Sequence, residues 1–105
     1  MPDDEFKNIF KLAEQLATLQ KQTVKSVLDV YEPVVEDIIQ LNINDKHLIE
    51  KALDQLLDVA FDITVLDLFK RLCRHYYFIN AETTVFYVNS YREMWDENSF
   101  ETNAE

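Results

Sequence analysis

The apolar residues of the first forty positions recur at alternating spacings of four and three. Pro33 interrupts this stripe near its end. Such a near-heptad period predicts a long amphipathic helix, which either kinks at Pro33 or ends near Tyr31 and starts again with Pro33 at its first position. The positions on the stripe are Phe6, Phe10, Ala13, Ala17, Gln20, Val24, Val27, Tyr31, Val34, Ile38 and Leu41.

A break follows at residues 42–45 (NIND), where Asn44 or Asp45 can cap the next helix. Helical spacing then continues over residues 46–79 and predicts one long second helix, although the β-branched residues of 61–69 (FDITVLDLF) weaken its middle and leave a hinge there as an alternative. Asn80 is placed to cap a last helix from Ala81 to about Asp96. A rival interpretation pairs residues 59–66 and 83–88 as strands, because both are rich in β-formers.

These elements predict an all-α fold, a long antiparallel helical hairpin plus a shorter C-terminal helix. Val59, Phe61, Val65 and Leu68 lie off the main apolar line of the second helix. Exposed apolar surface of that extent usually marks an interface, so we expect a bundle-like core completed by a homodimer. Residues 1–97 are expected to form the single helical domain, and residues 98–105 a disordered acidic tail.

The composition excludes several classes of site. The chain of 105 residues has no glycine, so the glycine-rich phosphate loop, the dinucleotide fingerprint and the nucleophile elbow are absent. We therefore expect no enzymatic activity and no cofactor. The net charge of −10 disfavours direct binding to a nucleic-acid backbone and favours a basic protein as partner.

Other features bear on location. No apolar run is long enough to span a membrane. The acidic start, MPDDEF, leads into no signal-peptide core, and a single cysteine suits a reducing compartment. We expect a cytoplasmic protein.

Carboxylates repeat every four residues along the predicted second helix, and a similar line occupies the first. Folding the two helices antiparallel places Glu36 level with Glu50 near the turn, and Lys7 and Lys11 level with Arg71 at the open end. The sequence therefore predicts an acidic ridge that could dock a basic partner. Its residues are Asp29, Glu32, Glu36, Glu50, Asp54, Asp58 and Asp62.

Aromatic residues gather near the end of the second helix and on the last one. We expect most of them to pack together as core; a less favoured alternative makes Tyr77, Tyr87, Tyr91 and Trp95 a partner-binding patch. Cys73 and His75 point about 200° apart on a helix, so they cannot share a metal or form a nucleophile–base pair. We interpret Cys73 as a small core residue.

The resulting hypothesis is a non-enzymatic accessory, regulatory or inhibitor-type protein. It would bind a basic protein through its acidic helical face. Two alternatives stay open: a carboxylate-lined metal-binding or enzymatic bundle, for which His47 and Glu50 are a weak signal, and a protein whose long amphipathic helix coats a surface.

Overall fold

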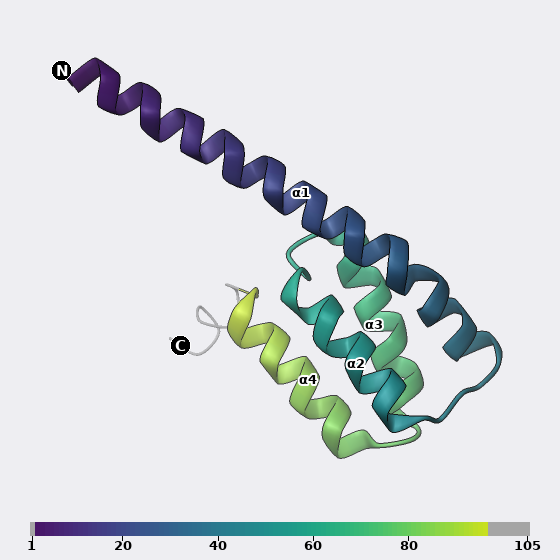
Figure 1. Cartoon of the computed structure of the whole chain (residues 1–105). Helices are drawn as coiled ribbons and strands as arrows, with labels where there is room; N and C mark the ends of the chain where they lie inside the picture. Colours follow the sequence, from purple (N-terminus) through teal and green to yellow (C-terminus); the bar gives the residue numbers. More distant parts are fainter. Residues whose placement is uncertain (1, 97–105) are drawn as a thin grey trace, which may run out of the picture.

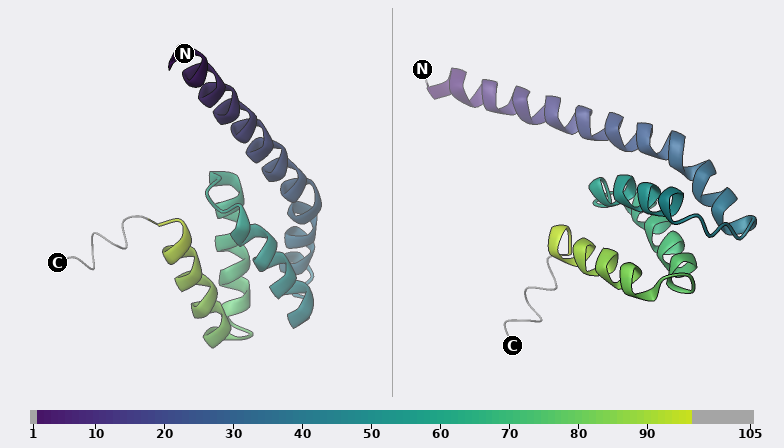
Figure 2. Two further views of the ribbon diagram at one scale, coloured as in Figure 1. Left: turned by 60° about the vertical axis from the view of Figure 1, so that its left-hand side comes forward. Right: turned by 60° about the horizontal axis from the view of Figure 1, so that its bottom comes forward.

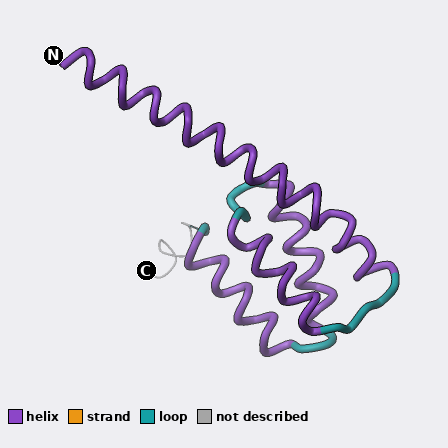
Figure 3. Tube along the Cα trace, viewed as in Figure 1, coloured by secondary structure: helices purple, strands orange, loops and turns teal. Residues whose placement is uncertain are grey.

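The structure is a computed structural model that describes residues 2–96, with side chains from Lys7 onward (Figures 1 and 3). Four helices make up this part of the chain: α1 (Pro2–Gln40), α2 (Lys46–Asp58), α3 (Ile63–Tyr77) and α4 (Ala81–Met94). No strand occurs between residues 2 and 96, so the all-α prediction is confirmed and the strand pairing is wrong. The tail predicted for residues 98–105 lies outside the described residues.

Polar side chains set where the helices begin and end. Asp45, Asp62 and Asn80 are the N-caps of α2, α3 and α4, and each side chain accepts hydrogen bonds of 3.0–3.3 Å from backbone N–H groups of the first turn. The cap predicted at Asn80 is thus confirmed, and of the two candidates for the start of α2, Asn44 and Asp45, the cap is Asp45. After α1, Asn42 adopts a φ of 51°, the left-handed conformation that glycine supplies at the end of many helices.

A continuous second helix over residues 46–79 is wrong, and the hinge given as its alternative is the better prediction, because the chain turns between Val59 and Asp62. The Asp62 carboxylate competes for backbone N–H groups that a continuous helix would bond internally. The turn folds α3 back along α2. Val59, Val65 and Leu68, expected to be exposed, are therefore buried at 5%, 0% and 3% exposure, whereas Phe61 remains 44% exposed.

Helix α1 continues through Pro33, so of the two alternatives given for this residue the restart is wrong and the kink remains. Pro33 lies on the exposed side of the helix, where water can satisfy the carbonyl that loses its partner. Figure 2 shows α1 bending toward the other helices in its C-terminal part, as expected where a proline removes a backbone hydrogen bond.

The C-terminal part of α1 and helix α4 pack on opposite sides of the α2–α3 pair (Figures 1 and 2). The core lies between these helices. The rest of α1 projects beyond them, which explains a radius of gyration of 17.3 Å where about 13 Å is usual for this length. The fully buried core residues are Val35, Ile38, Ile49, Ala52, Leu53, Leu56, Val65, Leu72 and Tyr76.

Candidate functional site

Within residues 7–23, the projecting part of α1 has no buried side chain. We call residues 7–23 the arm, because every one of them is exposed. Its large apolar side chains are nevertheless confined to one broad half of the helix surface, and they are 57–66% exposed: Ile9, Phe10, Leu12, Leu16 and Leu19. The same stripe continues through Val24 and Val27 to residues that pack on the core. The arm therefore extends a packing surface that nothing in the described chain covers.

The charge of the arm differs from that of the bundle. Lys7, Lys11 and Lys21 stand against a single acid, Glu14, within the arm. Residues 28–67 carry ten Asp and Glu against two lysines. Most of the net negative charge of the chain thus lies in residues 28–67, although Asp3, Asp4 and Glu5 directly precede the arm on the same helix.

A cavity of about 450 Å³ lies where the arm joins the bundle. Its walls come from α1 and from the α2–α3 connection. Asp29, Glu32 and Asp62 meet around this cavity, so three residues of the predicted ridge are brought together here. The residues lining it are Ala17, Gln20, Lys21, Val24, Lys25, Leu28, Asp29, Glu32, Phe61 and Asp62.

Two other ridge residues hold tyrosines in place. The Tyr76 hydroxyl of α3 donates a hydrogen bond to the carboxylate of Glu50. The Tyr87 hydroxyl of α4 donates to Asp54 over 2.7 Å. Burial, followed by the adjacent carboxylate, raises the pKa of Tyr76 to about 12 and raises that of Tyr87 as well. Helix α2 therefore fixes both neighbouring helices through carboxylates that were predicted to face a partner.

Glu36 and Arg71 form an ion pair between α1 and α3, with 2.7 Å between Oε1 and Nη1. The hydrogen bond from Arg71 lowers the pKa of Glu36, and the same bond raises the pKa of Arg71. Arg71 was expected to lie level with Lys7 and Lys11, and this prediction is wrong because the turn after α2 brings α3 beside the C-terminal part of α1. Asp58 is exposed at the end of α2.

The predicted aromatic patch divides into a buried and an exposed part. Tyr87 is 5% exposed. Tyr91 lies 6.0 Å from Phe69 between ring centres, and Trp95 donates its indole N–H to the backbone carbonyl of Leu57 over 2.8 Å. Tyr77, in contrast, is 53% exposed. Three of these four side chains thus connect α4 to α2 and α3.

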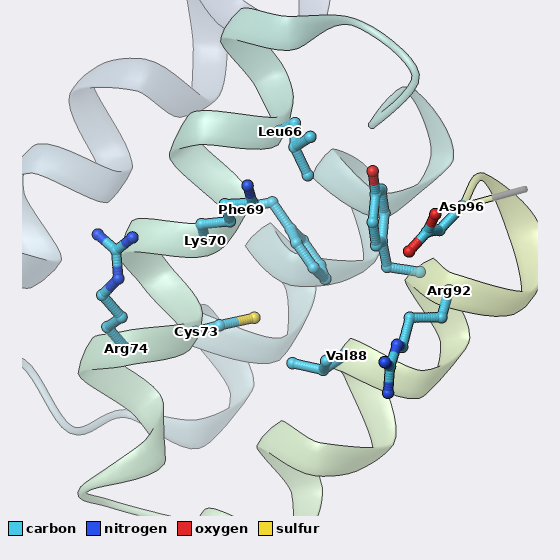
Figure 4. A pocket seen from close by; sticks show the side chains of 9 residues that line it. Leu66, Phe69, Lys70, Cys73, Arg74, Val88, Arg92 and Asp96 are labelled. Carbon is cyan, nitrogen blue, oxygen red and sulfur yellow. The ribbon is translucent and has the colours of Figure 1, made fainter. Parts of the chain in front are cut away.

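A groove between α3 and α4 has no counterpart among the sites predicted from the sequence. One cavity of about 460 Å³ and another of about 430 Å³ share Cys73, Arg74 and Val88. Figure 4 shows the Cys73 sulfur pointing across the groove toward Val88. Burial raises the pKa of the Cys73 thiol to about 12, so the sulfur stays protonated and is a poor nucleophile.

Basic side chains flank this groove, which has a mainly apolar floor. Lys70 and Arg74 come from α3, and Arg92 from α4. The sequence feature that could indicate this groove is the helical spacing of Leu66, Phe69 and Cys73. That spacing is equally typical of a fully packed helix face, so it does not distinguish a groove from core.

The two histidines have separate surroundings. His75 makes a 2.8 Å hydrogen bond through Nε2 with the carbonyl of Ile43, and His47 is exposed at the start of α2. Within the described residues no three His, Cys, Asp or Glu side chains are grouped so as to hold a metal ion. None of the described helices has the length and apolar character needed to cross a membrane.

Comparison of the chain with models of protein families, with curated proteins and with solved structures gives no match in any of the three.

Proposed function

We propose that this chain is a non-enzymatic interaction protein that acts as a homodimer and binds a basic protein through acidic residues of its bundle. The observation that carries the proposal is the arm. Seventeen consecutive helical residues have an apolar stripe and no tertiary contact that buries them. An exposed apolar surface of this kind is typical of a site that binds another chain.

The acidic character of the bundle supports the choice of a basic partner. The C-terminal part of α1 and helix α2 contain most of the ten acids of residues 28–67. Exposed carboxylates of one sign attract and orient a partner of opposite charge, and they do so more weakly as salt is added. Of the predicted ridge, Asp54 and Asp58 are exposed on α2 and offer carboxylate oxygens to such a partner.

The test compares capture of basic proteins from a lysate by immobilised wild-type chain and by the Asp54→Asn/Asp58→Lys variant. Asparagine keeps an oxygen that can accept from Tyr87, so the bundle is preserved. A control, Glu82→Gln/Glu93→Lys, makes the same change in net charge on α4. We expect a protein that wild type and the control retain, that the ridge variant loses, and that moderate salt elutes. Equal retention by both variants would refute the docking role of α2.

A further inference from the structure

We propose that the acidic segment of residues 97–105, which follows the described part of the chain, occupies the groove between α3 and α4 of its own molecule. Phe100 lies on the apolar floor of the groove, and Glu97 and Glu101 pair with the cations at its edge. This contact goes beyond the proposed function, since it involves neither the arm nor the acidic residues of α2.

The form of the groove is the first reason. Its two cavities share Cys73, Arg74 and Val88, so they follow one another along both helices. Figure 4 shows Phe69, Cys73 and Val88 pointing into the space between α3 and α4. The larger cavity, of about 460 Å³, has room for a phenyl ring. Burying an aromatic side chain removes on the order of 150–250 Å² of surface from water, so an aromatic residue is a suitable anchor for this floor.

The charges are the second reason. Residues 97–105 contain three glutamates and no basic residue. Residues 68–96 contain four Lys and Arg against three acids, whereas residues 28–67 contain ten acids against two lysines. An acidic segment attached to α4 is therefore repelled by α2 and the C-terminal part of α1, and it is attracted to the side of the bundle formed by α3 and α4.

Lys70 and Arg74 supply this attraction. Both line the groove and are exposed, and neither forms an ion pair within residues 7–96. In Figure 4 the Arg74 side chain runs along the outer side of α3, from which its guanidinium reaches the edge of the groove by a change of rotamer. Among the described residues that line the groove Asp96 is the one acid, and Asp67 precedes Lys70 by one turn. Basic residues remain in excess when both acids are counted.

The length of the connection is the third reason. Asp96 lines the groove itself, so residue 97 begins at its edge. The four residues from Asp96 to Phe100 span up to about 14 Å when extended. Val88 precedes Asp96 by eight residues, which is about 12 Å along a helix. Phe100 therefore reaches the floor near Val88 when the segment runs back along α4. So short a tether gives an effective concentration in the millimolar range, and a weak contact is enough to fill the groove.

Other occupants fit the groove less well. A basic segment, such as the arm with its lysines, is repelled by Lys70 and Arg74. Residues 97–105 of a second copy have the right chemistry. They lack the tether, however, and two molecules of net charge −10 repel each other as wholes. The segment of the same molecule is therefore favoured.

The first experiment measures the methyl proton shifts of Val88 by NMR in the full chain. An aromatic ring changes the shifts of methyl protons that lie close to it. Phe100→Leu keeps an apolar side chain and removes the ring, so the Val88 signals should move, and they should move with Phe100→Ser as well. The control Thr102→Ser alters the same segment and should leave them in place. The signals of Val35, which is fully buried on α1, should not move in any of these variants.

The second experiment tests the charges with the same signals. Lys70→Glu/Arg74→Glu should release the segment and move the Val88 signals as Phe100→Leu does. Glu97→Lys/Glu101→Lys should have the same effect. Combining all four changes should restore the wild-type shifts, because opposite charges then face each other again. The control Lys46→Glu/Lys51→Glu makes the same change in net charge at exposed positions of α2 and should leave the Val88 signals in place.

Three results would overturn the contact within one molecule. They are Val88 shifts that are equal in wild type and Phe100→Leu; a fourfold charge variant that does not regain the wild-type shifts; and a difference that develops only as the protein is concentrated from tens of micromolar to millimolar, which would place the segment in the groove of a second copy. None of these measurements changes the arm, Asp54 or Asp58. Their outcome is therefore independent of the capture experiment.

Discussion

Replacing Tyr76 with phenylalanine tests whether the acidic residues of α2 stabilise the packing of the neighbouring helices through hydrogen bonds. The Tyr76 ring is fully buried, so Tyr76→Phe leaves the packing unchanged and removes only the hydroxyl that donates to Glu50. A hydrogen bond to a charged group contributes about 1.5–3 kcal/mol. Because the half-buried Glu50 can recover a water molecule, we expect a loss at the lower end, about 1.5 kcal/mol, or roughly tenfold in the folding equilibrium.

Urea denaturation followed by helical circular dichroism measures this loss. With a slope of about 1–2 kcal/mol per molar urea, the midpoint should fall by about 1 M. The matched control is Tyr77→Phe, because the neighbouring Tyr77 is 53% exposed and its change should stay within about 0.5 kcal/mol. All samples need one protein concentration, since dimerisation adds to apparent stability. Equal midpoints for the two variants would refute the stabilising role of the hydrogen bond between Tyr76 and Glu50.

Three further predictions concern the bundle. Asp62→Ala removes the N-cap of α3 and should cost about 1 kcal/mol in urea denaturation, whereas Asp58→Ala should cost little; equal losses would contradict the capping role. Leu56→Ala should cost about 2–5 kcal/mol because Leu56 is fully buried, whereas Leu16→Ala, measured at concentrations that favour monomers, should leave the free energy of unfolding nearly unchanged. A large loss from Leu16→Ala would place the arm inside the bundle. The raised pKa values of the two buried tyrosine hydroxyls mean that folding favours their neutral forms. Stability should therefore be constant with respect to these groups below pH 10, their ordinary pKa, and fall as the pH rises through about 12; unchanged unfolding midpoints across that range would contradict the burial of the hydroxyls.

Local signals were sufficient to predict most helix limits. The break at residues 42–45, the cap at Asp45 and the start of α4 after Asn80 are confirmed. Each depends on a short polar side chain next to a periodic apolar segment, and such information is contained within one turn of helix. Asp62 has the same capping chemistry, but it also fits a regular i, i+4 series of acids. The apolar spacing over residues 46–79 favoured a continuous helix, with a hinge in residues 61–69 as the alternative, so Asp62 was assigned to the series and not to a cap.

The incorrect prediction that Val59, Val65 and Leu68 are exposed follows from the assumption of a continuous helix. On an unbroken helix these side chains would point away from the apolar line. The turn before Ile63 changes the direction of the chain, and the three side chains lie in the core. Large apolar side chains remain exposed elsewhere, both along the arm and on the bundle, where Ile63 and Phe78 are 82% and 89% exposed. The expectation of a homodimer thus keeps its physical basis, although the surface that supports it has moved.

The roles of individual carboxylates could not be predicted from the sequence. Tyr76 lies 26 residues from Glu50, and Tyr87 lies 33 residues from Asp54. A repeat of acids along a helix shows which side chains share a face. It carries no information about which face receives a hydroxyl from a neighbouring helix, because that depends on how the helices pack.

The exposed arm gives the molecule two rates of amide hydrogen exchange. Backbone amides of the bundle are released only when the core opens, whereas those of residues 7–23 exchange whenever the end of α1 frays, since no tertiary packing holds that segment. A second chain bound along the stripe would slow the fast set and leave the slow set nearly unchanged. Deuterium uptake over this one segment therefore reports whether the protein is alone or assembled.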